Sequence, residues 1–418
     1  MIESIRKSKT DILTVIFFIV LFIVIRSIHF TAVLNFSFDQ GNGMAHVLEM
    51  WRNKEITLVG PGSSLSVNGK ELLQGVVNYY LTMFFALLGG FDPVGTSYIF
   101  MLFASLGIIP LYVGTKKLAD KKIALLMVVI YTLSFYFIDY TRFLFGPNYL
   151  IALTTILVYL MGEYKAKQNL RNLLLIFIYI GIMLQFHYQV FVVLGFLFFY
   201  YLILSKNKIK SLFVMILGFC IGFSPMIIFE LKNQFYNLKV LGEYIFLPKN
   251  TYGSFVDFVP HRYLSLVLLA LVGVIGYFRK FISYTLIFAI GLVLLIIDLF
   301  LYIPRPMHGF GMAPNWNYLM EKKTYEIIKG QHYKNFNIVN HVYDNLSMVV
   351  KFHLKKDGYK MNYEDYYNNQ FLYVVSRDPY VFDDPAYELY IFKPNKLIKT
   401  WKLNEFYNLY LFERIKSS

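Results

Sequence analysis

The carboxylate of Asp39 is a candidate for chemistry because of where it stands in the chain. It lies in the string Phe38-Asp39-Gln40-Gly41, about ten residues after the end of a long apolar run. A carboxylate at a boundary between water and lipid can serve as a general base, bind a metal ion, or remain an ordinary surface charge. The residue type alone leaves all three interpretations open, so the surrounding elements have to decide among them.

The composition is typical of a polytopic membrane protein and not of a soluble one. Of the 418 residues, 57% are hydrophobic, 19% are aromatic and only 16% are charged. Charged residues make up 28 of the 115 positions from 304 to 418, against 38 of the first 303. These proportions predict a transmembrane domain at residues 1–303, followed by a water-soluble domain at residues 304–418.

Several classes of function are excluded by what the sequence lacks. The net charge of +14 comes from short clusters of Lys and Arg between apolar runs, without the basic face of a nucleic-acid-binding protein. Cys220 is the only cysteine, which excludes a disulfide framework and a thiolate metal site. Glycine motifs for nucleotides are missing as well. No cofactor is predicted, and dependence on a divalent metal stays open because no cluster of metal ligands stands out.

Nine apolar runs are predicted to cross the membrane as helices. They are Asp11–His29, Gly95–Gly114, Ile123–Ile138, Tyr149–Met161, Leu173–Phe186, Val190–Leu204, Leu212–Phe229, Tyr263–Phe278 and Ile282–Ile303. A tenth run, Val76–Leu88, would extend only roughly 20 Å as a helix, less than the roughly 30 Å hydrocarbon core, so it is predicted to lie at the interface. The first run lacks a small-residue cleavage motif after it and is interpreted as a retained span.

The distribution of positive charge orients these spans. Cytoplasmic loops collect Lys and Arg, and a cytoplasmic amino terminus places 15 of the 24 cations of residues 1–303 on the inside. Three regions then lie outside: a first loop at residues 30–94, a second loop at residues 230–262, and the tail from residue 304. The chain is therefore predicted to sit in the cell or plasma membrane with an extracytoplasmic carboxyl-terminal domain.

The outside regions are predicted to be folded. Met44–Ile56 carries apolar side chains on one helical face and polar ones opposite, which is typical of an amphipathic helix on a membrane surface or on other protein. The tail is predicted to be a small α/β domain. Its predicted helices are Tyr318–Lys329 and a helix from Asn345 that Asp344 caps and Gly358 ends, and its predicted strands are Phe336–Val342, Phe371–Val375, Leu389–Phe392, Ile398–Leu403 and Leu409–Phe412.

Several short strings follow one another in an order that is similar to a family of membrane enzymes. They are Phe38-Asp39-Gln40-Gly41, Leu58-Val59-Gly60-Pro61 with Ser63 and Ser64, Asn78-Tyr79-Tyr80-Leu81, Asp139-Tyr140-Thr141-Arg142 with Pro147-Asn148, Gln185-Phe186-His187-Tyr188, and the run from Pro225 to Glu230. Over roughly residues 10–265 the chain resembles the family 39 glycosyltransferases of the C-type (GT-C) membrane superfamily. That group includes protein O-mannosyltransferases and lipid A aminoarabinose transferases.

The resemblance implies transfer of a sugar from a polyprenyl-phosphate carrier to an acceptor outside the membrane, with inversion and without a nucleotide sugar. A base must take the proton of the acceptor hydroxyl, and the resemblance points to Asp39 for this role. The family motif commonly carries a second acid where this chain has Gln40, which argues against a two-carboxylate mechanism. The acceptor class (protein, lipid or glycan) and the sugar stay open.

Four basic side chains on the predicted outside are candidates to stabilise the phosphate that leaves. Arg142 offers a planar fork suited to phosphate oxygens, or it anchors its span at the interface. His187 is either a phosphate contact or a hydrogen-bonded core residue, and Lys232 and Arg262 are phosphate contacts or interfacial anchors. The predicted supporting residues are Gln40, Tyr80, Asp139, Asn148 and Glu230. Two of them have an alternative, structural role: Asp139 in an ion pair with Arg142 or another cation, and Glu230 in an ion pair with Lys232.

Two other functions fit parts of the sequence. A flippase or transporter of lipid-linked sugars has a similar apolar mass, but the broken helices or symmetric halves of such proteins are not evident here. A non-catalytic scaffold is consistent with Gln40 in place of a second acid. Arg26 and Asp298, which are charges within spans, lie near the outer ends of those spans and are interpreted as snorkelling side chains.

Overall fold

The computed structural model describes residues 9–246 and 312–415, except 360–364, 378, 380, 384 and 385, together with positions 292, 293 and 296. Its chain contacts divide it into two units. The helical unit comprises Met1–Ile28, Ile56–Phe84 and Tyr98–Pro304, and the α/β unit comprises His29–Glu55, Phe85–Ser97 and Arg305–Ser418. The first predicted outside loop therefore contributes to both units. The predicted domain boundary at residues 303 and 304 lies outside the described residues.

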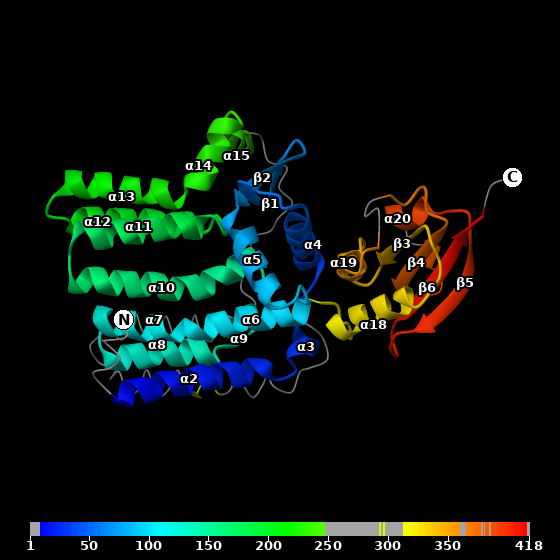
Figure 1. Cartoon of the computed structure of the whole chain (residues 1–418), viewed down its shortest axis with the longest axis horizontal. Helices are drawn as coiled ribbons and strands as arrows, with labels where there is room; N and C mark the ends of the chain where they lie inside the picture. The colour runs from blue at the N-terminus through cyan, green and yellow to red at the C-terminus, as the bar shows by residue number, and fades with distance from the viewer. Residues whose placement is uncertain are drawn as a thin grey trace. The chain divides into compact units, whose positions relative to one another are not determined.

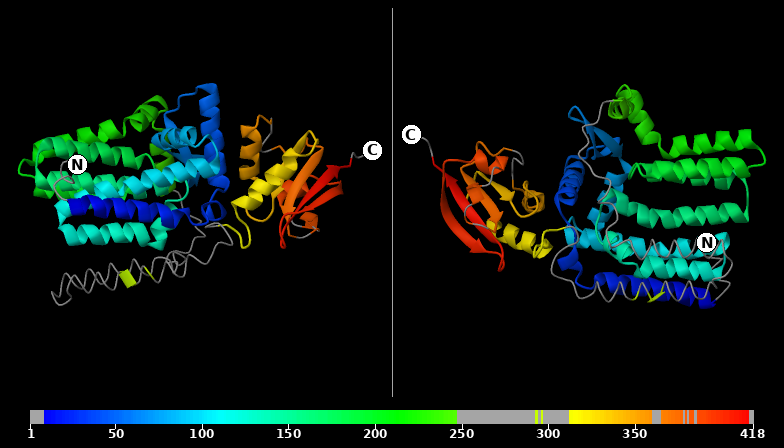
Figure 2. Two further views of the ribbon diagram at one scale, coloured as in Figure 1. Left: turned by 60° about the horizontal axis from the view of Figure 1, so that its bottom comes forward. Right: turned by 180° about the vertical axis from the view of Figure 1, so that it is seen from behind.

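The helical unit consists mainly of apolar helices that run side by side (Figures 1 and 2). In chain order they are α2 (Lys9–Ser27), α5 (Val77–Leu88), α6 (Pro93–Leu106), α7 (Ile108–Leu118), α8 (Lys121–Leu133), α9 (Phe135–Tyr140), α10 (Gly146–Ala166), α11 (Leu170–Leu184), α12 (Val190–Leu204), α13 (Lys208–Gly222), α14 (Ser224–Lys232) and α15 (Tyr236–Phe246). Helices α5 and α6 each extend into the α/β unit. The helices α7 and α10 pack closely at Gly114 of α7, where a β-carbon would lie only 2.5 Å from the Cα atom of Tyr159 in α10. Small residues at helix contacts are typical of membrane bundles.

The helical class predicted from the sequence is confirmed, whereas the number of spans is not. Among the described residues, two stretches are long and apolar enough to cross a membrane, α2 and the stretch Pro93–Leu118 that α6 and α7 form together. A third results if α13 and α14 count as one span bent by 73°. Pro225 in the first turn of α14 explains this bend, because proline cannot continue the hydrogen bonding of α13. The predicted spans Tyr263–Phe278 and Ile282–Ile303 lie almost wholly outside the described residues.

An antiparallel hairpin follows in the helical unit, where the sequence predicted only a loop. Strand β1 (Val59–Val67) pairs with β2 (Lys70–Gly75). The turn is Asn68-Gly69, and both residues have positive φ, 51° and 75°. Asn-Gly is the favoured pair for a two-residue turn of this kind. This dipeptide was the sequence signal for the hairpin.

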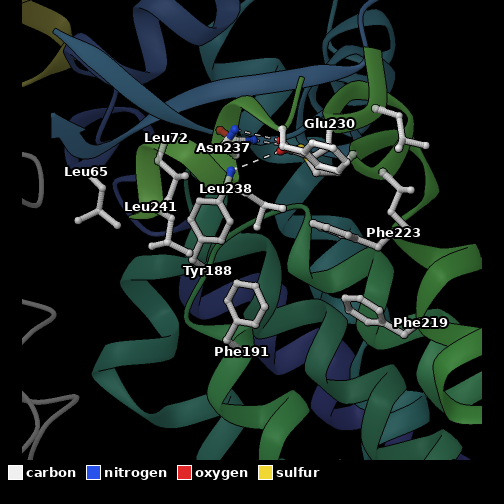
Figure 3. A pocket seen from close by; sticks show the side chains of 14 residues that line it. Leu65, Leu72, Tyr188, Phe191, Phe219, Phe223, Glu230, Asn237, Leu238 and Leu241 are labelled. Carbon is white, nitrogen blue, oxygen red and sulfur yellow. Dashed lines mark hydrogen bonds between the residues drawn. The ribbon is translucent and has the colours of Figure 1, made fainter. Parts of the chain in front are cut away.

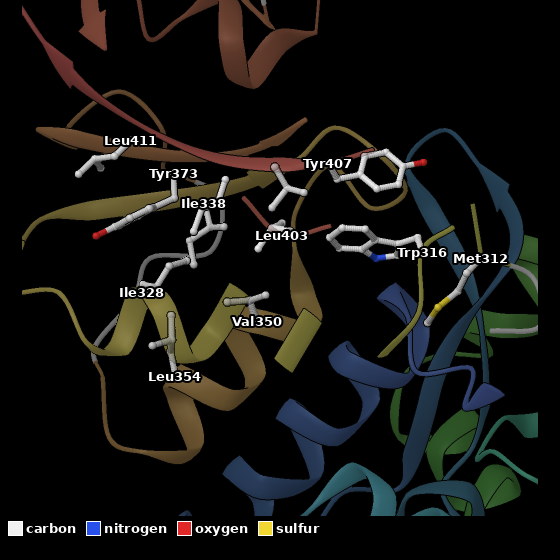
Figure 4. Packing of buried hydrophobic residues seen from close by; sticks show 12 residues of the cluster. Met312, Trp316, Ile328, Ile338, Val350, Leu354, Tyr373, Leu403, Tyr407 and Leu411 are labelled. Carbon is white, nitrogen blue, oxygen red and sulfur yellow. The ribbon is translucent and has the colours of Figure 1, made fainter. Parts of the chain in front are cut away.

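The α/β unit contains a four-stranded sheet of order β3-β4-β6-β5, in which β3 and β4 are parallel and the other pairs are antiparallel. Its elements are α3 (Phe30–Val33), α4 (Phe38–Asn53), α18 (Tyr318–Lys329), β3 (Phe336–Asn340), α19 (Met348–Lys356), β4 (Phe371–Ser376), the 3₁₀ turn η3 (Val381–Asp383), α20 (Tyr387–Tyr390), β5 (Asn395–Lys402) and β6 (Asn408–Arg414). Side chains alternate between the two faces of the sheet, so that Tyr373 packs in one apolar cluster and Val374 in another. Figure 4 shows the first cluster, which includes Trp316, Ile338 and Leu411.

Most predicted elements of the tail are confirmed, and two need correction. The predicted strand Leu389–Phe392 is wrong, because these residues lie in and after the helical turn α20. Leu389 and Phe392 are fully buried, and a short buried turn has the same apolar pattern as a short strand. The helix expected from Asn345 begins instead at Met348, although the Asp344 carboxylate does accept the backbone N–H group of Met348 at 2.8 Å.

Candidate functional site

Asp39 lies in the first turn of α4, and its two neighbours in that turn fix the backbone there. Ser37 precedes the helix, and its backbone N–H and its hydroxyl both donate to Oε1 of Gln40, at 3.1 and 2.6 Å. The bond from the Ser37 backbone to the Gln40 side chain is one half of a capping box, in which side chains at the start of a helix satisfy backbone donors that the helix leaves free. The amide of Gln40 therefore has a structural role at the position where the resembling family commonly carries a second acid.

The Asp39 side chain is exposed, unlike its neighbours Ser37 and Gln40. No hydrogen bond or ion pair joins its carboxylate to another residue in the part of the chain that the structure describes. Partial desolvation by the surrounding protein raises the pKa of Asp39 above its ordinary value of 3.8. A carboxylate that is accessible, unpaired and more basic than usual is suited to accept a proton from a hydroxyl group.

Arg142 is buried at the end of α9 and holds the carboxyl-terminal end of α2. Its guanidinium donates to the carbonyl oxygens of Ile25 and Arg26, both at 3.2 Å, and lies 3.9 Å from the Asp139 carboxylate. Carbonyl groups in the last turn of a helix have no partner within the helix, so a cation is stabilising there. The predicted ion pair between Asp139 and Arg142 is confirmed. To hold a phosphate, Arg142 would have to leave these carbonyl groups.

Arg26 corrects one sequence interpretation. Its side chain is fully buried and donates to the Thr141 hydroxyl at 2.7 Å and to the carbonyl oxygens of Thr132 and Tyr131 at 2.9 and 3.1 Å. The guanidinium also lies over the ring of Phe22. Arg26 therefore does not snorkel to the interface, because the breaks after α8 and α9 supply acceptors inside the bundle. Asp298 lies outside the described residues.

His187 stands between α11 and α12 and is half-buried. Its Nδ1 atom accepts the backbone N–H of Gln189 at 3.3 Å, which leaves the hydrogen of the neutral ring on Nε2. Burial lowers the pKa of His187, so the neutral form is favoured. In this state the ring can offer one N–H donor but no positive charge.

Glu230 and Lys232 stand close in sequence and differ in environment. The Glu230 carboxylate is buried and accepts the backbone N–H groups of Asn237 at 3.1 Å and Leu238 at 3.3 Å, at the start of α15. Lys232 is exposed at the end of α14. Within the described residues no ion pair joins the two, so the predicted pairing is not seen. Glu230 instead stabilises the start of a helix.

An apolar cavity of about 410 Å³ opens beside Glu230 in the helical unit (Figure 3). Side chains from the hairpin and from α12, α13, α14 and α15 line it, among them Leu65, Leu72, Phe191, Phe219, Leu238 and Leu241. Tyr188 and Asn237 are polar residues of the lining, and the side chains of both are hydrogen-bonded to the backbone of Leu73 in β2. The sequence did not single out Asn237, which carries no motif and gains its place only when α15 meets the hairpin.

Two of the predicted supporting residues, Tyr80 and Asn148, donate hydrogen bonds to backbone carbonyl groups. The hydroxyl of Tyr80 donates to the carbonyl oxygen of Thr57 at 3.1 Å, which joins α5 to the start of the hairpin. Asn148 is fully buried, and its Nδ2 donates to the carbonyl oxygen of Phe143 at 3.1 Å, while none of the residues that the structure describes bonds to its Oδ1. Both contacts order backbone around the first turns of their helices.

The predicted site residues are distributed over the two units. Asp39 and Gln40 belong to the α/β unit, and Arg262 lies outside the described residues. The others belong to the helical unit: Tyr80, Asp139, Arg142, Asn148, His187, Glu230 and Lys232. In the part of the chain described by the structure, no group of three His, Cys, Asp or Glu side chains is placed to hold a metal ion. Metal dependence stays open.

The comparison with protein families agrees with the resemblance seen in the sequence. Residues 74–229 match the family of dolichyl-phosphate-mannose-protein mannosyltransferases. The matched segment contains Tyr80, Asp139, Arg142, Asn148 and His187, and it leaves out Asp39 and the tail. No curated protein matches the chain. Residues 74–229 are therefore similar to a family of membrane glycosyltransferases of the GT-C type, which confirms the resemblance predicted from the sequence.

Proposed function

We propose that this protein transfers a sugar from a polyprenyl-phosphate carrier to an acceptor on the outer face of the membrane. The observation that carries the proposal is the family match over residues 74–229, since dolichyl phosphate mannose, the donor in that family's name, is a lipid-linked sugar. The apolar helices of the same segment are consistent with a membrane enzyme. The sugar and the acceptor class are left open by the proposal.

In the proposed reaction Asp39 acts as the general base. Its carboxylate takes the proton of the acceptor hydroxyl while the acceptor oxygen attacks the anomeric carbon of the sugar. The bond from this carbon to the phosphate oxygen breaks, and its electron pair stays on the phosphate. The products are the glycosylated acceptor with inverted configuration, polyprenyl phosphate and a protonated Asp39. The exposed and unpaired carboxylate supports this role.

The carrier chain would occupy the apolar cavity beside α13 and α14. Its lining is almost entirely hydrocarbon and aromatic rings, with Tyr188, Glu230 and Asn237 as polar exceptions. Burial of apolar surface contributes roughly 25 cal/mol per Å², so a prenyl chain in this cavity would gain binding energy without polar contacts. The groups proposed to meet the phosphate are His187, Lys232 and Arg262, and Arg142 only if it exchanges its carbonyl partners for phosphate oxygens.

The proposal is tested by sugar transfer in lipid vesicles, comparing the wild-type protein with Asp39→Asn. A panel of radiolabelled polyprenyl-phosphate sugars serves as donor and membrane extract as acceptor. Loss of a general base lowers the rate by about 100-fold or more, so label should leave the carrier with the wild-type protein and barely with the variant. Asp383→Asn, which neutralises an exposed acid of the tail, is the matched control and should transfer normally.

Other results would point to the alternative functions. Movement of the labelled lipid between leaflets, equal in wild type and Asp39→Asn and without bond breaking, would indicate a flippase. Donor binding without transfer or movement, equal in both proteins, would indicate a scaffold. Transfer at equal rates in both proteins would retain the enzyme and remove Asp39 as its base.

A further inference from the structure

Helix α15 forms one wall of the apolar cavity in the helical unit, and the hairpin of β1 and β2 forms another. Leu238 and Leu241 of α15 line the cavity, as do Leu65 and Leu72 of the hairpin. The helix also packs directly on both strands. The position of α15 on the hairpin therefore determines how wide the cavity is on this side.

The amide side chain of Asn237 joins α15 to the hairpin. Its Oδ1 accepts the backbone N–H group of Leu73 at 2.8 Å, and its Nδ2 donates to the carbonyl oxygen of Leu73 at 3.2 Å. Asn237 is 7% exposed, and its amide bonds to β2 in the way that the backbone of a neighbouring strand would. An exposed ion pair between Lys70 and Glu243, 3.7 Å apart, is a weaker link because water screens it.

The connection between α14 and α15 is strained, and Glu230 holds it. Gln234 and Phe235 both have positive φ, 53° and 59°, a conformation that residues with a β-carbon rarely adopt. The Glu230 carboxylate accepts the backbone N–H groups of Asn237 and Leu238 (Figure 3). The carbonyl oxygen of Glu230 accepts the backbone N–H group of Phe235 at 2.7 Å. These bonds fix the direction in which α15 leaves α14.

The polar groups of the lining are engaged within the protein. The side chains of Tyr188, Glu230 and Asn237 all bond to backbone groups. None of the described residues that line the cavity is Lys, Arg or His, and the Glu230 carboxylate would repel a phosphate. The cavity therefore fits a hydrocarbon chain whose charged end lies elsewhere, and the isoprenoid chain of the carrier is such a chain.

We infer that Asn237 sets the width of a subsite that recognises the isoprenoid chain of the donor by hydrocarbon contact alone. This inference rests on the proposed function, in which the donor is a polyprenyl-phosphate sugar. Asn237 acts through α15 and the hairpin, so it is a positioning residue. Because the chain makes the same contacts before and during transfer, these contacts strengthen donor binding and leave the rate of the bound complex unchanged.

The first measurement identifies what occupies the cavity. The full-length protein in phosphatidylcholine vesicles receives farnesyl phosphate whose chain carries a photoreactive diazirine, and mass spectrometry locates the cross-linked peptides. We expect cross-links in the peptides that contain the lining residues of the hairpin and of residues 219–241. Farnesol, which has the chain but no phosphate, should remove these cross-links, whereas the same amount of dioleoylphosphatidylglycerol should not.

The second measurement compares Asn237→Ala with Asn233→Ala. Both changes remove an amide that donates to a backbone carbonyl, but Asn233 is exposed, bonds to Phe229 of its own helix at 2.9 Å and does not line the cavity. For Asn237→Ala we expect the donor KM to rise about tenfold and kcat to stay within about twofold, because two hydrogen bonds that position α15 are lost. Cross-linking should fall in parallel, and Asn233→Ala should behave as the wild type.

A third variant, Leu241→Trp, narrows the cavity and keeps the hydrogen bonds of Asn237. A larger side chain at this position occupies space that the chain would fill, so cross-linking should fall as in Asn237→Ala. Thermal unfolding of Leu241→Trp should remain as in the wild type. This variant tests the subsite even if Asn237→Ala fails to fold.

Each outcome decides the inference. Wild-type cross-linking and KM in Asn237→Ala, or wild-type cross-linking in Leu241→Trp, would overturn it. A fall in kcat at constant KM would also overturn it, as would equal competition by phosphatidylglycerol, which would assign the cavity to bilayer lipids. If the wild-type protein transfers no sugar, the proposed function fails. Cross-linking then decides by itself: cross-links that farnesol removes and Asn237→Ala weakens support the chain subsite, and their absence overturns it.

Discussion

Each of the two units contains a fully buried ionisable side chain, Arg26 or Glu321, and the surrounding protein satisfies these two side chains differently. In the helical unit, Arg26 is fully buried and its guanidinium donates to three oxygen atoms. In the α/β unit, Glu321 is equally buried, but only its Oε1 atom is bonded, to Trp316 and Asn340, and no residue in the described part of the chain bonds to its Oε2 atom. Burial raises the pKa of Glu321 to about 8, so this side chain is mostly neutral at pH 7. A buried group keeps its charge only where the fold satisfies it.

Asp39 is the third case and the informative one for function. It is exposed, no residue within the described ranges bonds to its carboxylate, and hydrogen bonds between Ser37 and Gln40 hold the backbone on either side of it. Arg26, Arg142 and Glu230 are thus buried and bonded, whereas the carboxylate of the proposed base is accessible.

The largest effect is expected for Arg26→Ala. The change leaves two backbone carbonyls and a threonine hydroxyl without their donor inside the bundle, and loss of one member of a buried charged network costs about 3 kcal/mol or more. Thermal unfolding in detergent should show a strongly destabilised helical unit. Arg52→Ala, which removes an exposed arginine of the α/β unit, is the comparison. A normal melting temperature for Arg26→Ala would show that its buried hydrogen bonds are not structural.

The pH dependence of transfer tests Asp39 directly. A base works only when it is deprotonated, and the pKa of Asp39 is raised above 3.8, so kcat/KM should fall as the pH drops through a value above 3.8. The residual activity of Asp39→Asn should lack this acid limb. Persistence of the same limb in the variant would assign it to another group.

Glu321→Gln should stabilise the α/β unit at neutral pH. The pKa of Glu321 is near 8 in the folded protein and 4.5 ordinarily, so between these values the folded protein binds the proton that the unfolded chain has lost. The contribution of this group to stability therefore falls as the pH rises from about 4.5 to about 8. Glutamine keeps the neutral acceptor, and we expect a gain of about 1 kcal/mol or more at pH 7 that vanishes near pH 4. A gain that is independent of pH would contradict this explanation.

A local effect, confined to α4 and its contact with α19, is expected from a pair of alanine substitutions on α4. Gly41→Ala places a methyl group against the Met348 backbone, which should cost about 1–3 kcal/mol and speed exchange in α4. Gly43→Ala meets no atom within 4 Å and should stabilise the helix by about 0.5–1 kcal/mol. Equal effects at the two positions would show that α4 is not packed on α19.

Several features could be predicted from sequence patterns, and the reasons for the failures are specific. The helix Tyr318–Lys329 was predicted at its observed bounds, with Gly330 marking its end, and the structure adds Asn317 as the residue whose side chain caps its start. The strand predicted at Leu389–Phe392 failed because four apolar residues do not distinguish a turn from a strand. The hairpin was overlooked although Asn68-Gly69 marks its turn.

The sequence by itself determined the helical class, the small α/β tail and the family resemblance. Hydrophobic periodicity depends on residues that are near one another in the chain, and the resemblance depends on the order of the motifs, so both are visible in the linear sequence. Only the tertiary structure decided the roles of individual polar groups. It assigned Arg142 to the end of α2, Gln40 to the capping box and Glu230 to the start of α15, and it packed the helix of Asp39 on α19. Arg142 bonds to a carbonyl group 116 residues away and Arg52 of α4 to one 303 residues away, so no local pattern records these partners. Gln40 and Glu230 bond to Ser37 and Asn237, which lie three and seven residues away, and their roles became clear only once the structure showed where α4 and α15 begin.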